Sequence, residues 1–454
     1  MCAVIGAIVG ALDTDSKRNF ANRLLNYIFI ASHERGRDGR GWHVNEDGAV
    51  HTEKDVKRAS AADWKDVEFF KTKTTRGVLI GNVRAEPTTE YVKDKRLADQ
   101  QPYASWKWSV VHNGTIANDA ELRTGIVDTK IDSAAIAETL ETADSFRHGI
   151  DRLVGSYAII ATDGDPSRLF VAANYRPIWY VETEVGAFFA SSRKYFPGYL
   201  TPKMLTPYSV AFFTFEDGSC HKRIESLYKE QGDHKALVVC SGGLDSVVAA
   251  TYVQRVLGYK TELLHFLYGS RAQTPEINAV KAVSKALGVR CNFLNVPLYK
   301  ASDSPLLQAN SAIAGGEEGA EFAYEWVPAR NLVLLAMATA YAEANGFQAV
   351  VLGNNLEEAG AYPDNEQEFT ERFNDILPFA VGAGKRVQIL TPVANLMKHE
   401  IVELGLRLGA PLDKTWSCYR AGEKHCGKCG PCFMRRTAFK INGKEEVIEY
   451  ESLD

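Results

Sequence analysis

Short apolar runs separated by glycine-rich turns dominate the first half of the chain, up to about residue 225. These runs predict β-strands at Ala3–Val9, Gly77–Val83, Trp108–His112, Tyr157–Thr162, Leu169–Ala172 and Ala187–Ala190. Helical spacing interrupts them twice, near Ser16–Ser32 and near Asp132–Ala143. Runs of strands with segregated helices indicate a layered α+β domain.

From Lys235 onward, apolar runs alternate with helical spacing. Strands are predicted at Ala236–Cys240, Thr261–Leu267, Cys291–Val296 and Ala349–Gly353, and helices at Ser246–Leu257, Glu276–Leu287 and Asn331–Asn345. This alternation predicts an α/β, doubly wound parallel sheet that binds ligands at the carboxyl ends of its strands. The charged segment Ser226–His234 is the predicted linker between the two halves.

Composition narrows the class of protein. A chain of 454 residues with 45% hydrophobic residues suggests two or three globular domains, at about 150 residues per domain. The net charge of −5 gives no global basic field that would attract nucleic acid. The longest apolar stretch, Leu332–Ala342, is far short of the roughly 20 residues that a bilayer requires, and no signal peptide is evident. Eight sparse cysteines argue against a disulfide scaffold, so we expect a cytoplasmic protein without a membrane partner.

The first candidate for chemistry is Cys2. If Met1 is removed, this residue carries both a thiol and a free α-amine, and the amine could activate the thiol as a nucleophile. Taken alone, Cys2 is more simply interpreted as the start of a buried strand.

Further motifs change that interpretation. They follow Cys2 in the order Arg35-Gly36-Arg37-Asp38, Gly81-Asn82-Val83-Arg84, Gln101-Pro102-Tyr103, His112-Asn113-Gly114-Thr115-Ile116-Ala117-Asn118 and Asp132-Ser133. Together they resemble the class II glutamine amidotransferase domains, which use an N-terminal cysteine nucleophile. The resemblance covers about the first 200 residues.

This resemblance implies a role for each matching residue. Cys2 would attack the side-chain amide of glutamine and release ammonia through a thioester. Asn113 and the backbone N–H of Gly114 would stabilise the oxyanion. Arg84 would pair with the substrate α-carboxylate and Asp132 with its α-ammonium group.

A glycine turn follows the first predicted strand of the second half. It reads Ser241-Gly242-Gly243-Leu244-Asp245-Ser246 and precedes a helix, so free N–H groups are expected to face a phosphate there. The hexapeptide resembles the pyrophosphate loop of ATP-pyrophosphatases, which cleave ATP to AMP and pyrophosphate. By that resemblance, Asp245 would help to orient Mg²⁺ and phosphate.

Four of the eight cysteines lie close together, at Cys418, Cys426, Cys429 and Cys432. Four thiolates at this spacing fit a closed, structural Zn²⁺ site. An iron–sulfur cluster is the alternative, because thiolates also suit iron.

The region from about Lys235 to Phe439 resembles the 7-cyano-7-deazaguanine synthase family. The resemblance rests on the glycine turn, the cysteines and four further motifs, which are Tyr268-Gly269, Glu276-Ile277, Trp326-Val327-Pro328-Ala329-Arg330-Asn331 and Tyr362-Pro363-Asp364. In that family, the carboxylate of 7-carboxy-7-deazaguanine is adenylated, aminated to an amide and then dehydrated to the nitrile with a second ATP. Zinc is structural there.

The same resemblance implies a substrate pocket. Arg330 and Asn331 would lie near the nucleotide and substrate, Tyr362 and Asp364 near the deazaguanine, and Trp416 and Arg420 at the rim. This chain departs from the family pattern at Asn354–Glu358, and it has Asn365 where the family usually has cysteine after Tyr-Pro-Asp. Such changes favour a pocket that accepts a different base, or the base within a polymer.

These features predict an αββα N-terminal-nucleophile sandwich over residues 2–225. A doubly wound α/β domain with a C-terminal zinc-binding segment is predicted over 235–454. The preferred function is glutamine- and ATP-dependent amination of a 7-deazaguanine derivative, most simply 7-carboxy-7-deazaguanine to the nitrile.

Three alternatives stay open. The first is amidotransfer to 7-cyano-7-deazaguanine within tRNA or DNA, giving an archaeosine-type base. The basic residues Lys424, Lys428, Arg435, Arg436 and Lys440 fit either such a polymer contact or a solvated helix face. The second is a ligase of the asparagine synthetase type, which shares the two-module logic but lacks the cysteine cluster. The third is a non-catalytic zinc-ribbon module that binds nucleic acid, against which the complete set Cys2, Arg84, Asn113 and Asp132 argues. The sequence leaves a homodimer open.

Overall fold

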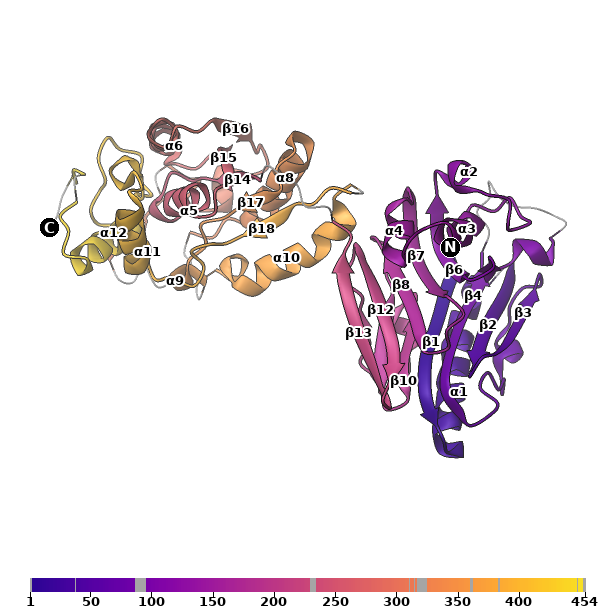
Figure 1. Ribbon diagram of the computed structural model, residues 1–454. Helices are drawn as coiled ribbons and strands as arrows, with labels where there is room; N and C mark the ends of the chain where they lie inside the picture. The colour runs from indigo at the N-terminus through magenta and orange to yellow at the C-terminus, as the bar shows by residue number, and fades with distance from the viewer. Residues whose placement is uncertain are drawn as a thin grey trace. The chain divides into compact units, whose positions relative to one another are not determined.

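The computed structural model describes residues 2–36, 38–85, 95–228, 234–309, 311–313, 315–316, 325–359, 362–382, 384–446 and 448–451. The chain divides into two compact units, Met1–Lys229 and Glu230–Asp454 (Figure 1). Arg37 of the first motif and residues 229–233 of the predicted linker lie outside the described residues. Within the described ranges, no helix has both the length and the apolar character needed to cross a membrane.

Two antiparallel sheets form the first unit. The seven-stranded sheet has the order β11-β9-β10-β1-β4-β2-β3 and the six-stranded sheet the order β13-β12-β8-β7-β6-β5. The strands of the first sheet are β1 (Ala3–Leu12), β2 (Gly39–Glu46), β3 (Ala49–Asp55), β4 (Thr74–Arg84), β9 (Trp179–Thr183), β10 (Gly186–Ala190) and β11 (Lys203–Met204). Those of the second are β5 (Tyr103–Ala104), β6 (Ser109–Ile116), β7 (Gly155–Thr162), β8 (Arg168–Ala173), β12 (Ser209–Glu216) and β13 (Ser219–Ser226).

The two sheets pack face to face, with helices on their outer faces. Alternate side chains of β1 and β4, such as Ile8 and Val78, meet Ile160 and Phe213 of the other sheet in one buried cluster. Helix α1 (Asp15–Ser32) covers the outer face of the larger sheet. Helices α3 (Ala134–Glu141) and α4 (Phe146–Asp151) cover the outer face of the smaller one, which α2 (Asp119–Leu122) also adjoins. This order of layers confirms the predicted αββα sandwich.

Helix α1 shows how local sequence places an outer layer. Thr14 caps its first turn by accepting a hydrogen bond from the Lys17 N–H at 3.3 Å, a contact worth about 1 kcal/mol in typical helices. Leu25 and Phe29, four residues apart, are fully buried against the sheet.

The second unit is a five-stranded parallel sheet with the order β16-β15-β14-β17-β18. Its strands are β14 (Lys235–Val239), β15 (Lys260–Leu267), β16 (Cys291–Asn295), β17 (Ala349–Val351) and β18 (Gln388–Leu390). One face packs against α5 (Leu244–Arg255), α6 (Gln273–Leu287), α11 (Lys398–Leu408) and α12 (Gly430–Ile441). The other packs against α8 (Arg330–Asn345) and α10 (Gln367–Ala380), and α9 (Leu356–Ala359) is a single turn after β17. The predicted doubly wound α/β fold is therefore confirmed.

Several elements were absent from the sequence prediction. Strand β3 exposes nearly all of its side chains, so it shows no apolar run. Helices α10 and α11 have charged faces and only a few buried side chains each. Their places depend on packing partners distant in sequence.

Candidate active sites and metal centre

Cys2 lies immediately before β1, in the middle of the larger sheet of the first unit. Its neighbour Ala3 pairs with Val83 of β4, so Arg84, the next residue of β4, lies at the same end of these two strands as Cys2. The half-buried thiol donates to the Ala85 carbonyl at 3.8 Å. Burial raises the pKa of Cys2, and the nearby Arg84 charge opposes that rise. The fold thus places a thiol and a guanidinium side by side.

Arg84 is almost fully buried and donates to the Asp99 carbonyl. That carbonyl also accepts from the Tyr103 hydroxyl at 2.7 Å. Burial raises the pKa of Tyr103, Arg84 opposes this, and Cys2 and Asp132 add to it. All three predicted residues therefore lie within electrostatic reach of one tyrosine. Tyr103 belongs to the Gln101-Pro102-Tyr103 motif, from which no role for its hydroxyl is predicted.

The backbone at Gly114 is shaped for close approach. Its φ is +153°, and a Cβ there would lie 1.9 Å from the Ser156 carbonyl oxygen, so only glycine fits. Asn113 precedes it on β6 and is buried. Beyond the strand, Asp132 accepts from the N–H groups of Ile116 and Ser133, each at 2.6 Å.

The chain before Gly114 is held by its neighbours. The Gln101 side-chain amide donates to the His112 carbonyl at 3.0 Å and accepts from the His112 N–H at 2.7 Å. Next to it, Gln100 is fully buried, and its side-chain amide has no hydrogen-bond partner in the described part of the chain. Sequence reasoning assigned neither glutamine a role, because a polar residue outside a strand carries no burial signal.

In the second unit, a cavity of about 290 Å³ opens at the carboxyl ends of β14, β15 and β17. The glycine turn forms one wall. Gly242 has a φ of +86°, and the Ser241 hydroxyl accepts from the Gly243 N–H at 3.2 Å. Helix α5 starts directly afterwards, so its N-terminal end, with the free N–H groups and partial positive charge of a first helical turn, lies at this cavity. Ser241, Gly243, Leu244, Asp245 and Ser246 all line it.

Gly353 sets how closely the end of β17 approaches this turn. A Cβ at Gly353 would lie 2.5 Å from the backbone nitrogen of Ser246, which is shorter than any real contact. The absence of a side chain therefore lets the strand end touch the first turn of α5.

An ion cluster lies against the turn. The Lys398 ammonium lies 2.6 Å from Asp245 Oδ2 and 3.3 Å from Glu358 Oε1. Burial disfavours the charge on Lys398, but Asp245 and Glu358 raise its pKa above the usual value. No motif pointed to Lys398, since it lies 153 residues after its partner.

Four of the six residues predicted for the substrate pocket line the cavity: Arg330, Asn331, Tyr362 and Trp416. Asp364 and Arg420 are not among its lining residues in the described part of the chain. Asp364 is half-buried, and burial raises its pKa although the Arg330 charge opposes this. Arg420 is exposed, and its backbone N–H donates to Cys418 Sγ at 3.3 Å.

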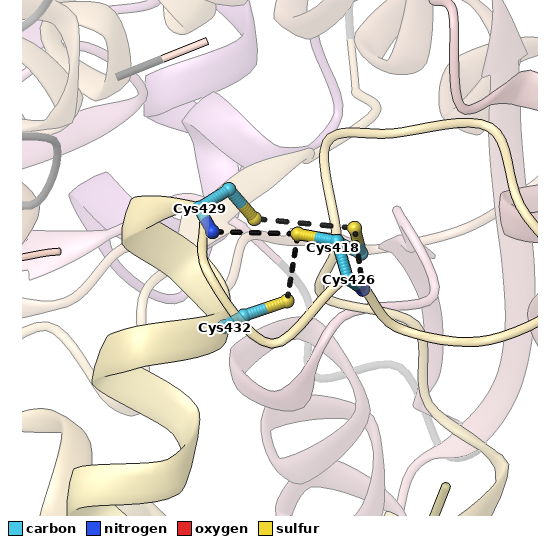
Figure 2. Close-up of side chains that lie close together, drawn as sticks. All are labelled: Cys418, Cys426, Cys429 and Cys432. Atoms are coloured by element: carbon cyan, nitrogen blue, oxygen red, sulfur yellow. Dashed lines mark hydrogen bonds between the residues drawn. The ribbon is translucent and has the colours of Figure 1, made fainter. Parts of the chain in front are cut away.

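The four cysteines converge beside this cavity (Figure 2). Their sulfur atoms all lie within 4.8 Å of one another, with Cys426–Cys432 at 4.0 Å and Cys418–Cys429 at 3.9 Å. A tetrahedral Zn²⁺ with bonds of about 2.3 Å needs sulfur separations of about 3.8 Å, so the donor set fits zinc. Backbone N–H groups of Cys426 and Cys429 also point at sulfur atoms, at 3.4 and 3.3 Å, which stabilises thiolates.

His425 does not join this set. Its Nε2 accepts from the Ser417 N–H at 3.0 Å, and burial lowers the pKa of the imidazole to about 4. The neutral imidazole is therefore hydrogen-bonded to the backbone of Ser417 and contributes to packing. The predicted four-cysteine set therefore stands without a fifth ligand.

Arg435 corrects one prediction. It was grouped with exposed basic residues, but it is 1% exposed and joins Glu446 Oε1 at 2.5 Å, Thr415 Oγ1 at 2.6 Å and the Leu412 carbonyl at 3.0 Å. Its guanidinium ties the segment before the cysteines to the segment after α12, so it cannot belong to a surface patch.

We expect Arg435→Met to destabilise the second unit by about 3–5 kcal/mol, because Glu446 would be left buried without its counter-charge. Urea unfolding followed by circular dichroism would measure this. Lys440→Met, at an exposed position of the same helix, is the control and is expected to stay within about 0.5 kcal/mol of the unchanged protein. Equal stabilities for the two variants would contradict the structural role of Arg435.

Comparison with known proteins gives matches to both units. The family model described as queuosine biosynthesis protein QueC matches residues 235–443, and a glutamine amidotransferase domain model matches residues 89–197. A protein of Sulfolobus acidocaldarius named 7-cyano-7-deazaguanine synthase is 42% identical over all of both chains. One of the same name from Methanothrix thermoacetophila is 40% identical over 48% of this chain and 99% of its own. Among solved structures, glutamine phosphoribosylpyrophosphate amidotransferase from B. subtilis aligns with 99% of this chain at 15% identity and a TM-score of 0.39.

Proposed function

Because the chain belongs to the 7-cyano-7-deazaguanine synthase family, we propose that it converts 7-carboxy-7-deazaguanine to 7-cyano-7-deazaguanine with ATP, using ammonia from glutamine. The observation that carries the proposal is the cavity of the second unit. Residues of the glycine turn, which suits a phosphate, and Arg330 both line it. A relative of about half this length bears the same name, which supports assigning the synthase reaction to one unit. The first unit would then supply the nitrogen.

In the first unit, the Cys2 thiolate attacks the side-chain amide carbon of glutamine. Asn113 and the Gly114 N–H donate to the oxyanion that forms. The α-amine of Cys2, free once Met1 is removed, accepts the thiol proton and passes it to the leaving nitrogen, so collapse of the tetrahedral intermediate expels ammonia and leaves a thioester. Arg84 binds the α-carboxylate and Asp132 the α-ammonium group, which fixes the amide over the thiol. Water then hydrolyses the thioester to glutamate and restores Cys2.

In the second unit, the turn from Ser241 to Ser246 binds the ATP phosphates, and Asp245 would help to hold the Mg²⁺ that accompanies them. A carboxylate oxygen of the base attacks the α-phosphorus and pyrophosphate leaves. Ammonia then attacks the acyl-adenylate, and the products are the amide and AMP. A second ATP adenylates the amide oxygen, and loss of AMP and a proton gives the nitrile, so the overall reaction is that of an ATP-dependent ligase.

The remaining predicted residues hold the base. Arg330 and Asn331 contact the acceptor and the nucleotide at the start of α8. The Tyr362 ring is stacked with the Trp326 ring, with 6.2 Å between the ring centroids, and offers a flat apolar face. Trp416 closes the rim. Asp364 and Arg420 would act from outside the cavity wall. Cys418, Cys426, Cys429 and Cys432 would hold Zn²⁺, which would cross-link the segment next to Trp416 and take no part in bond making.

The test uses the full chain with Mg²⁺, ATP and glutamine labelled at the amide nitrogen. One reaction contains free 7-carboxy-7-deazaguanine, and another contains tRNA or DNA bearing 7-cyano-7-deazaguanine. Label in a free nitrile, with two AMP formed per product, is the expected result by mass spectrometry. Label only in the polymer would instead establish the archaeosine-type alternative. Salt-dependent polymer binding without glutamine hydrolysis would identify a non-catalytic module.

A further inference from the structure

Asn365 lies at the middle of a continuous line of polar contacts along the wall of the second-unit cavity. On one side, Arg330 Nε donates to Asn331 Oδ1 at 3.3 Å, and Asn331 Nδ2 donates to Asn365 Oδ1 at 3.0 Å. On the other, Asn365 Nδ2 donates to Glu358 Oε2 at 3.4 Å.

The line continues from Glu358 to the glycine turn. Glu358 Oε1 accepts from Lys398 Nζ, which also donates to Asp245 Oδ2 at 2.6 Å. All of these residues line the same cavity. One contact sequence therefore runs from the side assigned to the acceptor base to the side assigned to the ATP phosphates.

The Asn365 side chain is held in this orientation. Asn365 is 9% exposed. Its backbone N–H donates to the Tyr362 carbonyl at 2.9 Å, and its backbone carbonyl accepts from Asn354 Nδ2 at 3.3 Å. Its neighbours need one acceptor and one donor at the same position. An amide supplies both, whereas a thiol is a weak donor and a weak acceptor. Asn365, one of the positions where this chain departs from the family pattern, thus joins the Arg330–Asn331 contacts to the Glu358–Lys398–Asp245 contacts.

We propose that Asn365 is a positioning residue that couples binding of the acceptor base to binding of ATP. A base that contacts Arg330 and Asn331 fixes the Asn365 amide, which fixes Glu358 and, through Lys398, the carboxylate of Asp245 beside the phosphates. Each ligand then tightens the other by the same factor, as thermodynamic linkage requires. This inference rests on the proposed function of the cavity.

The experiment is calorimetric titration of the full chain with α,β-methylene-ATP and Mg²⁺, with and without saturating 7-carboxy-7-deazaguanine. This analogue cannot release pyrophosphate, so binding is measured without turnover. We expect the base to tighten nucleotide binding at least about 5-fold in the unchanged protein, at the lower end of typical couplings. In Asn365→Ala we expect less than about 2-fold, with nucleotide affinity in the absence of the base changed little.

Two further variants make the result specific. Asn365→Asp keeps the size and the acceptor for Asn331 but cannot donate to Glu358 when ionised, so it should also lose the coupling. Asn345→Ala, at the exposed end of α8, the helix that carries Arg330 and Asn331, should keep it. Thermal unfolding of each variant shows whether it is folded, and the near-isosteric Asp variant carries the test if the Ala variant is not.

Coupling that survives in Asn365→Ala or Asn365→Asp, or its absence from the unchanged protein, would overturn the inference. Neither result touches the proposed function, which depends on nitrile formation by the unchanged protein. Absence of both nucleotide binding and nitrile formation would instead refute the proposed function itself.

Discussion

Replacing Cys2 by alanine is expected to lower glutamine-dependent product formation by at least about 1,000-fold. The Cys2 sulfur is the atom proposed to attack the amide carbon, and removing a nucleophile typically lowers the rate by this factor or more. Ammonium salts at high pH should restore product formation to within about 2-fold of the unchanged protein, because free ammonia bypasses the first unit. Product measured by mass spectrometry with glutamine or with ammonium as the nitrogen source separates the two effects.

Cys220→Ala is the matched control for this prediction. Cys220 is a half-buried thiol on β13, a strand that carries none of the residues assigned to glutamine, and burial raises its pKa to about 11. Its variant should use glutamine normally. If Cys2→Ala lost the ammonium-driven reaction as well, the separation of roles between the units would be wrong.

Loss of one metal-binding thiolate should have the largest effect on stability. In Cys429→Ser, we expect the protein to lose its equivalent of zinc and the second unit to unfold at much lower temperature. Structural zinc sites contribute about 10–16 kcal/mol of apparent binding free energy in small domains, and this energy is coupled to folding. Elemental analysis and calorimetric unfolding would measure both changes, while glutamine hydrolysis by the first unit should persist.

Cys291→Ser tests whether any thiol loss has this effect, since Cys291 lies in β16 away from the cluster. It should keep full zinc. Iron in place of zinc, with the visible absorption of an iron–sulfur cluster, would identify the alternative centre. Unchanged zinc content in Cys429→Ser would refute a four-thiolate site.

The features that could be predicted from the sequence are those whose residues lie within a short stretch of the chain. The glycine turn, from Ser241 to Ser246, lies within one strand–turn–helix unit, so its geometry is fixed locally. The four cysteines likewise lie within fifteen positions, and the apolar runs that became β1, β4 and β14 are each a short stretch of mostly buried residues. Layered and parallel folds follow from such local patterns.

Contacts between distant segments could not be predicted in this way. Lys398 and Arg435 look like ordinary surface charges on amphipathic helices, yet each is held in the interior by a carboxylate. Whether a charged side chain faces solvent or a counter-charge depends on which helix packs beside it, and single-sequence periodicity does not contain that information. The same applies to Asn365. The sequence shows that it departs from the family pattern, but it does not show that the side chain contacts Asn331 and Glu358.

The contact at Gly353 limits how this enzyme could be redesigned for other acceptors. Because the end of β17 rests directly on the backbone of Ser246, any side chain introduced at Gly353 would push the glycine turn away from its strand. A library that randomises this position should return glycine almost exclusively. New acceptor specificity must therefore be sought in the segments that follow, at Asn354–Glu358 and Asn365, where the chain already departs from the family pattern.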